Sequence, residues 1–387
     1  MKNINYIKNN NCTGCGGCSK ICPVSAIEIN RDENGFYSPN VNKNCIECGL
    51  CINVCYKMFK CEDDWNIKDS KSYLAYSLND EIRNRGSSGG IGEELCNFAL
   101  KNGYEVCGVI YDYENNIAKH IITNKEEDIK RIVGSKYIPS YTEEAFKNLD
   151  MNKKYIIIGT PCQIYSIRKF MQQKNIVDWI LIDFFCHGSP SLNLWDKYLD
   201  NIKRKESIKN ISNVNFRDKI IGWHKFSMTI EGDGKKYSNN LNEDYFMKCF
   251  LRNFDLQEAC YTCKLRFNKL YSDIRLGDFW GPKCLNNESG VSIVLTNTIL
   301  GEKFLKCIDK IYLEKVSYEE VKVSQYIEKI EIPREKEMFQ NELKSEKTLE
   351  QIYMNIVIPV EKKERKNYYI KLPFRITKKI IKKIFNS

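Results

Sequence analysis

The sequence predicts two folded parts, a small cysteine-rich module and a larger α/β domain, followed by a basic tail. Three observations predict this order. Eight of the 18 cysteines fall in two equal runs near the start of the chain. Strand-like apolar runs then alternate with helical stretches, which is typical of an α/β domain with some parallel pairing. Residues 362–387 hold ten Lys or Arg against one Glu.

The two cysteine runs form an internal repeat. Residues 12–23 read CTGCGGCSKICP and residues 45–56 read CIECGLCINVCY, at an offset of 33 residues. Each run has the C-x2-C-x2-C-x3-C spacing of a bacterial two-cluster ferredoxin, in which the fourth cysteine ligates the other cluster. We therefore expect an α+β ferredoxin-like module with two [4Fe-4S] clusters over residues 1–61. The expected ligands are Cys12, Cys15, Cys18 and Cys55 for one cluster, and Cys45, Cys48, Cys51 and Cys22 for the other.

A pair of four-cysteine zinc sites is the alternative interpretation of these runs. Zinc sites rarely place four cysteines so tightly twice, so the spacing favours clusters. The module has few apolar residues for a core, and clusters would stabilise it. Pro23 matches the proline that ends the motif, whereas Tyr56 takes that position in the second run. This departure does not affect ligation, because the proline shapes a turn and donates no ligand. Cys61 has no evident partner.

The composition, with 42% hydrophobic and 28% charged residues, is ordinary for a soluble globular protein. We expect no secretory signal in the first ten residues and no membrane-spanning helix, and therefore a cytoplasmic protein. In a reducing compartment, many cysteines indicate metal binding or catalysis rather than disulfides. The net charge is +10, and the basic tail supplies +9 of it. The rest of the chain is therefore near neutral, and we expect no nucleic-acid partner.

The chain after the module divides by composition and periodicity. Residues 62–72 are polar and aperiodic, as expected of a linker. Residues 73–310 are predicted to form the α/β domain, and residues 311–361 a helical extension. Expected strands are 104–111, 155–158, 179–185 and 291–295, expected helices begin near residues 91, 163 and 192, and 226–237 reads as a hairpin.

Four further cysteines indicate a third site. Cys162 and Cys186 each follow an apolar strand and precede a helix. Sites in open α/β sheets gather at the carboxyl ends of strands, so neighbouring strands would bring these thiols together. Cys260 and Cys263 add a two-ligand pair, and four thiolates suit a third iron–sulfur cluster or a zinc ion. In the alternative interpretation, Cys162 and Cys186 are small buried residues of the core.

A Ser/Gly-rich turn precedes the first helix of the α/β domain. Residues 87–90 offer backbone N–H groups to a pyrophosphate. Glu93 and Glu94, in the first helical turn, are less favourable to an anion. Lys136 could hold a phosphate, although its residue type alone favours a solvated surface lysine.

Six motifs then occur in one order over roughly residues 70–300. They are GSSGG at 86–90, VGSKY at 133–137, GTPCQ at 159–163, CHGSPS at 186–191, CYTC at 260–263 and DIRLGDFWG at 273–281. This order resembles the beta-subunit family of coenzyme F420-reducing hydrogenases and dehydrogenases, with the ferredoxin module fused ahead. The resemblance implies an α/β flavin-binding domain that holds FAD and an iron–sulfur cluster and passes electrons between them.

The resemblance also implies site residues. The ligands of the third cluster would be Cys162, Cys186, Cys260 and Cys263. The FAD contacts would be Ser87, Ser88, Gly89, Gly90, Ser135, Lys136, Tyr137, Thr160 and Asp278. Trp280 would belong to the site and His187 would tune it, whereas His120 and His224 are expected to be structural or exposed.

Three functions are compatible with these features. The first is an iron–sulfur flavoprotein oxidoreductase, in which clusters move single electrons and FAD exchanges two with a substrate. The second is an electron-transfer subunit that serves a partner enzyme, and the third is a structural metal-binding protein. We expect a redox partner protein or a small electron carrier. The sequence identifies no substrate and no catalytic residue.

The basic tail has the composition of an amphipathic helix. On a helical wheel, Ile376, Ile380, Ile381, Ile384 and Phe385 fall in one half, and Lys378, Lys379, Lys382 and Lys383 fall in the other. Such a helix lies on an anionic membrane surface. A solubilising end without structure, or a segment that docks on an acidic protein, would have the same composition. The hypothesis is peripheral attachment to the inner face of the cytoplasmic membrane.

Overall fold

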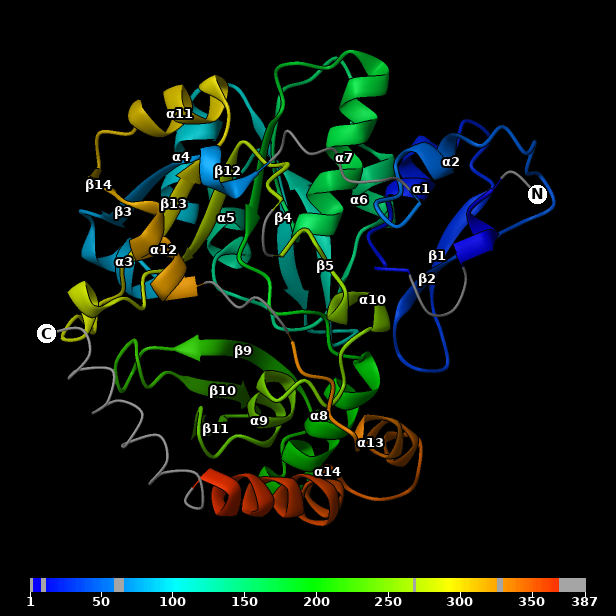
Figure 1. Cartoon of the computed structure of the whole chain (residues 1–387), viewed down its shortest axis with the longest axis vertical. Coiled ribbons are helices and arrows are strands. Elements are labelled where there is room, and N and C mark those ends of the chain that lie inside the picture. Colours follow the sequence, from blue (N-terminus) through cyan, green and yellow to red (C-terminus); the bar gives the residue numbers. More distant parts are fainter. Residues whose placement is uncertain (1–2, 8–11, 59–65, 267–268, 326–329, 369–387) are drawn as a thin grey trace, which may run out of the picture.

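The structure is a computed structural model that describes residues 3–7, 12–58, 66–266, 269–325 and 330–368. It has three parts (Figure 1): the N-terminal module, a nine-stranded sheet with its helices, and a lobe built on a three-stranded sheet. The module packs beside the large sheet, and the smaller lobe lies below it in this view.

The N-terminal module is built by the repeat. Its elements are the 3-10 turn Ile4–Ile7, α1 (Gly17–Ile21), β1 (Ile27–Arg31), β2 (Tyr37–Val41) and α2 (Leu50–Asn53), with β1 antiparallel to β2. Both helices begin after a left-handed glycine, Gly16 and Gly49, each with φ of 76°. The two glycines are 33 residues apart, as the cysteines are. Only a residue without Cβ adopts this conformation readily, so both turns depend on glycine.

The large sheet has the strand order β14-β3-β13-β12-β8-β7-β4-β5-β6. Its strands are β3 (Lys71–Ser77), β4 (Glu105–Asp112), β5 (Ile117–Thr123), β6 (Ser140–Tyr141), β7 (Tyr155–Ile158), β8 (Ile180–Phe184), β12 (Ile274–Asp278), β13 (Ser292–Thr296) and β14 (Ile311–Val316). The central strands β12, β8, β7 and β4 are parallel to one another. β3 runs in the same direction, because it is antiparallel to β13, which is antiparallel to β12. The carboxyl ends of these five strands therefore meet at one edge.

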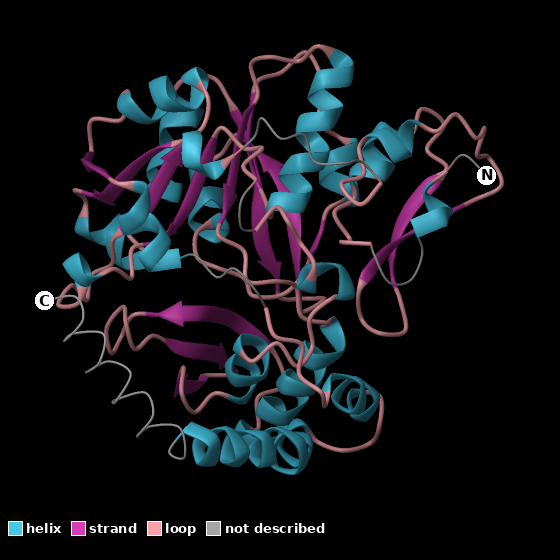
Figure 2. Cartoon of the chain, in the orientation of Figure 1, coloured by secondary structure: helices cyan, strands magenta, loops and turns pink. Residues whose placement is uncertain are grey.

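Helices cover both faces of this sheet (Figure 2). They are α3 (Asp80–Arg85), α4 (Ile91–Lys101), α5 (Glu126–Ile132), α6 (Glu143–Lys147), α7 (Pro161–Lys174), α11 (Ile299–Lys306) and α12 (Tyr318–Gln325), with short 3-10 turns at Ile67–Asp69 and Pro282–Cys284. The short helix α10 (Glu258–Tyr261) instead packs through Tyr261 with the smaller lobe. Adjacent residues of β7 show the alternation: Ile156 packs with α4, α5 and α11, whereas Ile157 packs with α7 and the module. A central strand buried on both faces is apolar throughout, as β7 is.

The smaller lobe has an aromatic core. It contains α8 (Leu192–Glu206), β9 (Ile211–Asp218), β10 (Ser227–Gly232), β11 (Lys235–Asn240), α9 (Tyr245–Leu251), α13 (Lys336–Leu343), α14 (Leu349–Ile352) and a π-helical turn at Tyr353–Val357. The indole of Trp195 stacks on Phe216 at 4.9 Å and packs edge-on against Phe246 at 5.1 Å. Helical residues 358–368 follow, and Arg252 of the lobe pairs with Glu364 at 2.5 Å.

The structure agrees with the predicted strands and the hairpin and corrects the predicted extension. Residues 311–361 are not helical throughout, because 311–316 form β14 at an edge of the large sheet. The segment reads IYLEKV, and its pairing with β3 outweighs its charged residues. Residues 62–65 of the predicted linker lie outside the described residues, and β3 already begins at Lys71. The amphipathic part of the tail also lies outside them. Among the described helices, none has the length and apolar character needed to cross a bilayer.

A buried ion pair fixes the register of β8 and β12. Arg275 and Asp183 are direct partners in the two strands, and both are almost fully buried. The guanidinium makes two parallel hydrogen bonds to the carboxylate, at 2.7 and 2.6 Å, and a third to the Leu265 carbonyl at 3.1 Å. The Ser272 hydroxyl donates to the same carboxylate at 2.8 Å. The pair therefore joins two strands and the loop that precedes β12.

We expect Arg275→Met to lower the free energy of unfolding by about 3–5 kcal/mol, because it leaves the Asp183 carboxylate buried without its partner. Denaturant unfolding of the full chain measures this. Arg131→Met is the matched control, since Arg131 pairs with Asp128 at the surface, and its loss should be much smaller. Equal losses in the two variants would contradict the assignment.

Candidate iron–sulfur and cofactor site

Four thiols of the module form a middle set, defined as Cys12, Cys15, Cys18 and Cys55. Burial, and then the neighbouring Cys15 thiol, raise the pKa of Cys12 to about 12, with Cys55 contributing. Burial and the same neighbours raise the pKa of Cys18. The Gly14 amide points at the Cys12 sulfur at 3.3 Å. The structure thus brings one cysteine of the second run to three of the first, the grouping expected from the sequence.

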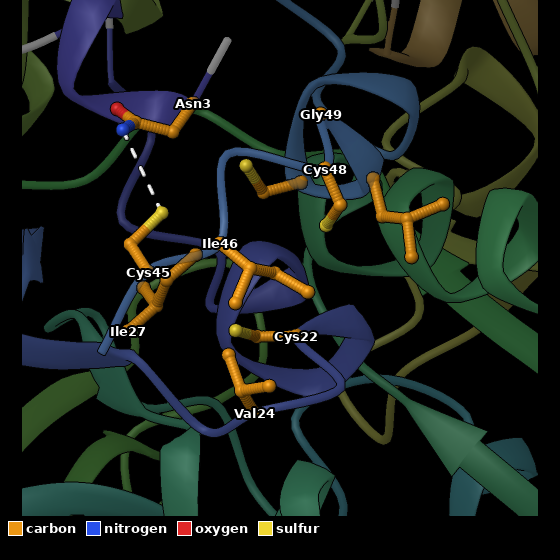
Figure 3. Close-up of a pocket in the computed structure, with 10 residues that line it drawn as sticks. Asn3, Cys22, Val24, Ile27, Cys45, Ile46, Cys48 and Gly49 are labelled. Carbon is orange, nitrogen blue, oxygen red and sulfur yellow. Dashed lines mark hydrogen bonds between the residues drawn. The ribbon is translucent and has the colours of Figure 1, made fainter. Parts of the chain in front are cut away.

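Four other thiols form an outer set, defined as Cys22, Cys45, Cys48 and Cys51. All four line one shallow cavity, and Figure 3 shows Cys22 of the first run with Cys45 and Cys48 of the second around it. The Asn3 amide donates to the Cys45 sulfur at 3.7 Å, and the Ala26 amide to the Cys22 sulfur at 3.2 Å. Cys48 is exposed, and the adjacent Ile46 is 61% exposed. The outer set therefore reaches the surface at Cys48, while Cys51 is buried.

Four thiols of the α/β domain form an inner set, defined as Cys162, Cys186, Cys260 and Cys263. Cys162 follows β7 at the start of α7, where the Gln163 side chain accepts from the Thr160 amide at 2.8 Å. Cys186 follows β8, the parallel neighbour of β7. Burial, and then the Cys186 and Cys263 thiols, raise the pKa of Cys260 to about 12. Helix α10 supplies Cys260, and Cys263 follows its end.

The three sets are neighbours in a fixed order. The Cys51 thiol of the outer set is close enough to the middle set to contribute, after burial and Cys15, to the raised pKa of Cys18 and of Cys55. After burial, Cys15 of the middle set is the strongest influence that raises the pKa of Cys162 in the inner set. Among the described residues, no three Cys, His, Asp or Glu side chains converge as ligands of a single metal ion.

Tyr56 lies where the module meets the inner set. Burial, and then the Cys263 thiol, raise the pKa of Tyr56, whose hydroxyl donates to the Cys263 sulfur. The same hydroxyl accepts from the Lys264 amide at 3.3 Å. The Tyr56 ring packs edge-on against Tyr165 at 6.0 Å, and Tyr165 packs against Tyr271 at 4.7 Å. The residue that departs from the proline of the motif is therefore the one that contacts the third site.

Arg266 also adjoins the inner set, and sequence reasoning missed it. Burial raises the pKa of Cys186, whereas the Arg266 guanidinium lowers it. The guanidinium also lowers the pKa of Cys260, against the larger effect of burial. A cation beside four thiols stabilises their ionised form. The available signal was a basic residue three positions after the CYTC run.

A cavity of about 480 Å³ extends from the inner set to the Ser/Gly turn. Its walls include three thiols of the inner set, Cys162, Cys186 and Cys260. Of the nine residues expected to contact FAD, eight line it: Ser87, Ser88, Gly90, Ser135, Lys136, Tyr137, Thr160 and Asp278. His187 and Trp280 line it as well. Residues from distant motifs therefore surround one space.

Gly89 is the exception, and its role is packing. Its amide donates to the Ser292 hydroxyl at 2.9 Å. A Cβ at this position would lie 2.6 Å from the Ala75 carbonyl oxygen and 2.9 Å from the Ser292 amide. The glycine lets the turn lie against β3 and β13. The structure thus places Gly89 behind the cavity wall, whereas the sequence analysis expected it to contact FAD.

Lys136 has a different partner from the one expected. Its amine donates to the carbonyl oxygens of Arg131, Ile132 and Val133 at 3.0, 2.7 and 3.0 Å. These are orphan carbonyls at the end of α5, so the amine caps that helix. Burial lowers the pKa of Lys136 to about 7, whereas the three carbonyl oxygens favour the charged amine. The lysine lines the cavity with its amine already bound.

The carboxylates near the Ser/Gly turn also have partners. Helix α4 begins after Gly90, whose φ is 81°, and no side chain caps its first amides. Glu93 pairs with Arg85 at 2.5 Å, and Glu94 accepts from the Ser77 hydroxyl at 2.5 Å. The two carboxylates therefore repel an anion less than the sequence alone suggests, and the start of α4 remains suited to binding an anion.

Asp278 lies at the carboxyl end of β12 and accepts two side-chain hydrogen bonds. Arg217 donates to it at 2.7 Å and the Trp223 indole at 3.1 Å. Trp280 stacks on Trp223 with ring centroids 4.3 Å apart. Burial opposes the charge of Arg217, but Asp278 and Tyr137 together outweigh it and the pKa of Arg217 is raised. Sequence reasoning missed Arg217 and Trp223, which precede the hairpin.

The histidines differ as expected in position. The His187 ring packs on Phe250 at 4.8 Å, and burial, with Arg266, lowers the pKa of His187 to about 4. His120 is buried, with Nε2 3.1 Å from the Ile158 carbonyl oxygen. His224 lies 3.5 Å from Glu288. Only His187 of the three lines the cavity.

The repeat and its two thiol sets define an iron–sulfur protein, and a 4Fe-4S dicluster domain matches residues 11–59. The coenzyme F420 hydrogenase/dehydrogenase beta subunit matches over two segments. Its N-terminal domain matches residues 72–147 and its C-terminal domain residues 152–321. The chain therefore belongs to the coenzyme F420 hydrogenase/dehydrogenase beta-subunit family and carries a dicluster domain ahead of it.

Individual relatives are distant. The chain is 24% identical over 320 residues to an F(420)H(2) dehydrogenase subunit of Methanosarcina mazei, covering 78% of this chain and 83% of the relative. It is 21% identical over 322 residues to coenzyme F420-dependent sulfite reductase of Methanocaldococcus jannaschii, covering 80% of this chain and 47% of the relative. A chain of the F420-reducing [NiFe] hydrogenase complex from Methanosarcina barkeri aligns at 18% identity and TM-score 0.42, covering 74% of this chain and 91% of that one.

We expect Gly89→Ala to destabilise the protein by about 1–3 kcal/mol, because the added methyl collides with backbone that cannot move freely. Thermal unfolding of the full chain measures the change. Gly92→Ala is the control, since Gly92 lines the cavity and its Cβ would meet only Leu276, at 3.7 Å. That variant should be neutral or more stable, as Ala is the better helix former. A stable Gly89→Ala protein would contradict the packing role.

Proposed function

We propose that the chain is an iron–sulfur flavoprotein that passes electrons between its ferredoxin module and a flavin bound in the cavity. The order of the thiol sets carries this proposal. The outer set reaches the surface at Cys48, the middle set adjoins it, and the inner set adjoins the middle set and forms part of the cavity wall. Three clusters in that order would connect the surface with the cavity.

The residues present fit [4Fe-4S] clusters. Each set supplies four thiols, and backbone amides already point at the sulfurs of Cys12 and Cys22. Such amide contacts are among the features that set cluster potentials. Burial raises the pKa of several of these thiols, so their ionisation would depend on the metal they bind. Tyr56 and Arg266 would then modulate the inner cluster by a hydrogen bond and a positive charge.

The cavity residues also fit a flavin. The volume is within the range of about 300–1,000 Å³ typical of ligand pockets. The start of α4 offers amides to a phosphate, and Ile132, Val133 and Leu276 supply apolar wall. FAD, once bound, would combine single electrons from the clusters into two-electron exchange with a substrate. The chain would hold it beside the inner set and exclude water from its surroundings.

The substrate class is inferred from the names of the relatives. Two of them are named for coenzyme F420, so we infer a two-electron carrier of that kind, with a nicotinamide as the other candidate. The second candidate function is an electron-transfer subunit that serves a partner enzyme. One observation favours it: the exposed side chains around the outer set, Val24, Ile46 and Cys48, suit contact with a redox protein. Turnover by the isolated chain separates the two functions.

Location is a further part of the proposal. A reducing compartment such as the cytoplasm would keep these cysteines available to iron. Attachment of the basic tail to the inner membrane face remains a prediction. Co-sedimentation of the full chain with anionic vesicles tests it, against a chain stopped after Leu372.

We expect anaerobically prepared protein to hold about twelve irons, and Cys162→Ser to hold about eight, because one four-iron cluster loses a ligand. Iron analysis and absorption spectra measure this. Cys307→Ser is the control, because Cys307 is exposed and belongs to none of the three sets. Full iron in Cys162→Ser would show that Cys162 is not a ligand. FAD is expected in the same preparation, and its absence under flavin-replete conditions would remove the flavin from the proposal.

We expect Tyr56→Phe to keep its iron and to lower the midpoint potential of one cluster. The hydroxyl donates to the Cys263 sulfur, and a donor stabilises the more negative, reduced cluster. Redox titration followed by electron paramagnetic resonance measures each potential. Tyr245→Phe, in the smaller lobe, is the control. If all potentials stay unchanged, Tyr56 does not act on a cluster.

A further inference from the structure

Four side chains with formal charge line the cavity among the described residues: Lys136, Arg217, Glu93 and Asp278. Lys136 is bound to three carbonyl oxygens at the end of α5. Glu93 is paired with Arg85. The remaining two form the ion pair Arg217–Asp278. Among the charged side chains of the wall, the capacity still open to a ligand must therefore be sought in this pair.

The guanidinium of Arg217 has an unused edge. The side chain comes from β9 of the smaller lobe and reaches Asp278 of the large sheet, and the residue is only 5% exposed. Nη1 donates to Asp278 at 2.7 Å, whereas Nε and Nη2 have no hydrogen-bond partner in the part of the chain that the structure describes. The Tyr137 hydroxyl also interacts with this guanidinium, yet Nε and Nη2 remain the two nitrogens without a partner among the described residues. Buried polar atoms of this kind call for a partner, because an unmet N–H costs free energy.

The geometry of that edge suits an anion. Nε–H and one Nη–H of a guanidinium are parallel and match the two oxygens of a carboxylate or phosphate. The guanidinium carbon lies 4.6 Å from the centre of the Phe226 ring and 5.4 Å from that of Trp280. These rings restrict the orientation of its plane. A fixed plane favours two-point recognition over a diffuse charge interaction.

The surrounding charge is positive. Lys219 donates to the Ser88 carbonyl at 2.6 Å and to the Arg83 carbonyl at 2.8 Å, so its ammonium lies behind the Ser/Gly turn. Burial and the nearby charges of Arg217 and Arg83 lower the pKa of Lys219, whereas the charge of Asp278 raises it. Arg217 and Lys219 thus lie near the Asp278 carboxylate, and Glu93, the other acid of the cavity wall, is paired with Arg85, beside the uncapped start of α4. Both the charges and the helix favour an anion here.

We propose that Arg217 binds an anionic group, a phosphate or a carboxylate, of the molecule that occupies the cavity. The inference rests on the proposed function for the presence of that molecule. Arg217 then has the role that was expected of Lys136. Two sources have the required chemistry: the diphosphate of the flavin dinucleotide and an acidic group of the substrate.

The test compares two cavity cations in the full chain. Arg217→Met and Lys136→Met each remove one positive charge from the cavity lining. Calorimetric titration measures FAD and inorganic pyrophosphate binding to flavin-free protein, and inorganic phosphate binding to FAD-loaded protein. We expect Arg217→Met to weaken at least one of these affinities tenfold or more, and Lys136→Met to change it less than threefold. Melting temperatures record whether each variant is folded.

The outcomes separate the sources. Weaker FAD and pyrophosphate binding in Arg217→Met assigns the arginine to the flavin diphosphate. Unchanged FAD binding with weaker phosphate binding to the loaded protein assigns it to the substrate. Pyrophosphate binding that depends on Arg217, in a protein that never binds FAD, would support the inference and reject the flavin. Wild-type affinities for all three probes in Arg217→Met would overturn it, as would a larger loss in Lys136→Met.

A second variant, Arg217→Lys, tests the inference if Arg217→Met does not fold. Arg217→Lys keeps the charge beside Asp278 but cannot present two parallel N–H groups. We expect it to fold and to bind the affected probe several-fold more weakly than the wild type. Binding equal to the wild type in Arg217→Lys would overturn the two-point recognition that the inference requires.

Discussion

The common direction of five strands is the constraint on which the site depends. β3, β12, β8, β7 and β4 all end at one edge of the large sheet, and the residues after each of the first four strands contribute to the cavity wall. Asp278, Cys186 and Cys162 come from different motifs but lie at the carboxyl ends of three neighbouring strands, β12, β8 and β7. The Arg275–Asp183 pair holds two of these strands in register. A slip between β8 and β12 would separate Cys186 from Asp278 and disrupt the cavity wall between them.

Local signals predicted a large part of this arrangement. The spacing of eight cysteines was sufficient to group them into two crossed sets, because ligand spacing is a short-range property of the chain. Tyr155–Ile158 was recognisable as a central strand, since burial on both faces makes a strand apolar throughout. Cys162 and Cys186 could then be placed together from the rule that sites form at strand ends.

Other parts could not be predicted, because they depend on contacts between distant segments. Arg217 meets Asp278 across 61 positions, and nothing near either residue indicates the partner. The amine of Lys136 was expected in the cavity because a motif contains it, but three carbonyls at the end of α5 are closer. Gly89 was assigned to a ligand for its backbone freedom, whereas β3 and β13 approach it from behind. β14 carries charges that suggested a helix, and its strand partner was unknown from sequence.

The duplicated motif of the module has a consequence for the direction of electron flow. Duplication of one twelve-residue pattern gives two chemically equivalent coordination sites, with a left-handed glycine at the same step of each. Equivalent sites would have equal potentials and no preferred direction. The surroundings of the two sets break this symmetry, because the Gly14 amide points at Cys12, the Asn3 amide points at Cys45, and only the outer set has an exposed thiol, Cys48. Polarity in such a relay would therefore come from what surrounds each set, the hydrogen bonds to its sulfurs and its exposure, rather than from the ligand pattern that the two sets share.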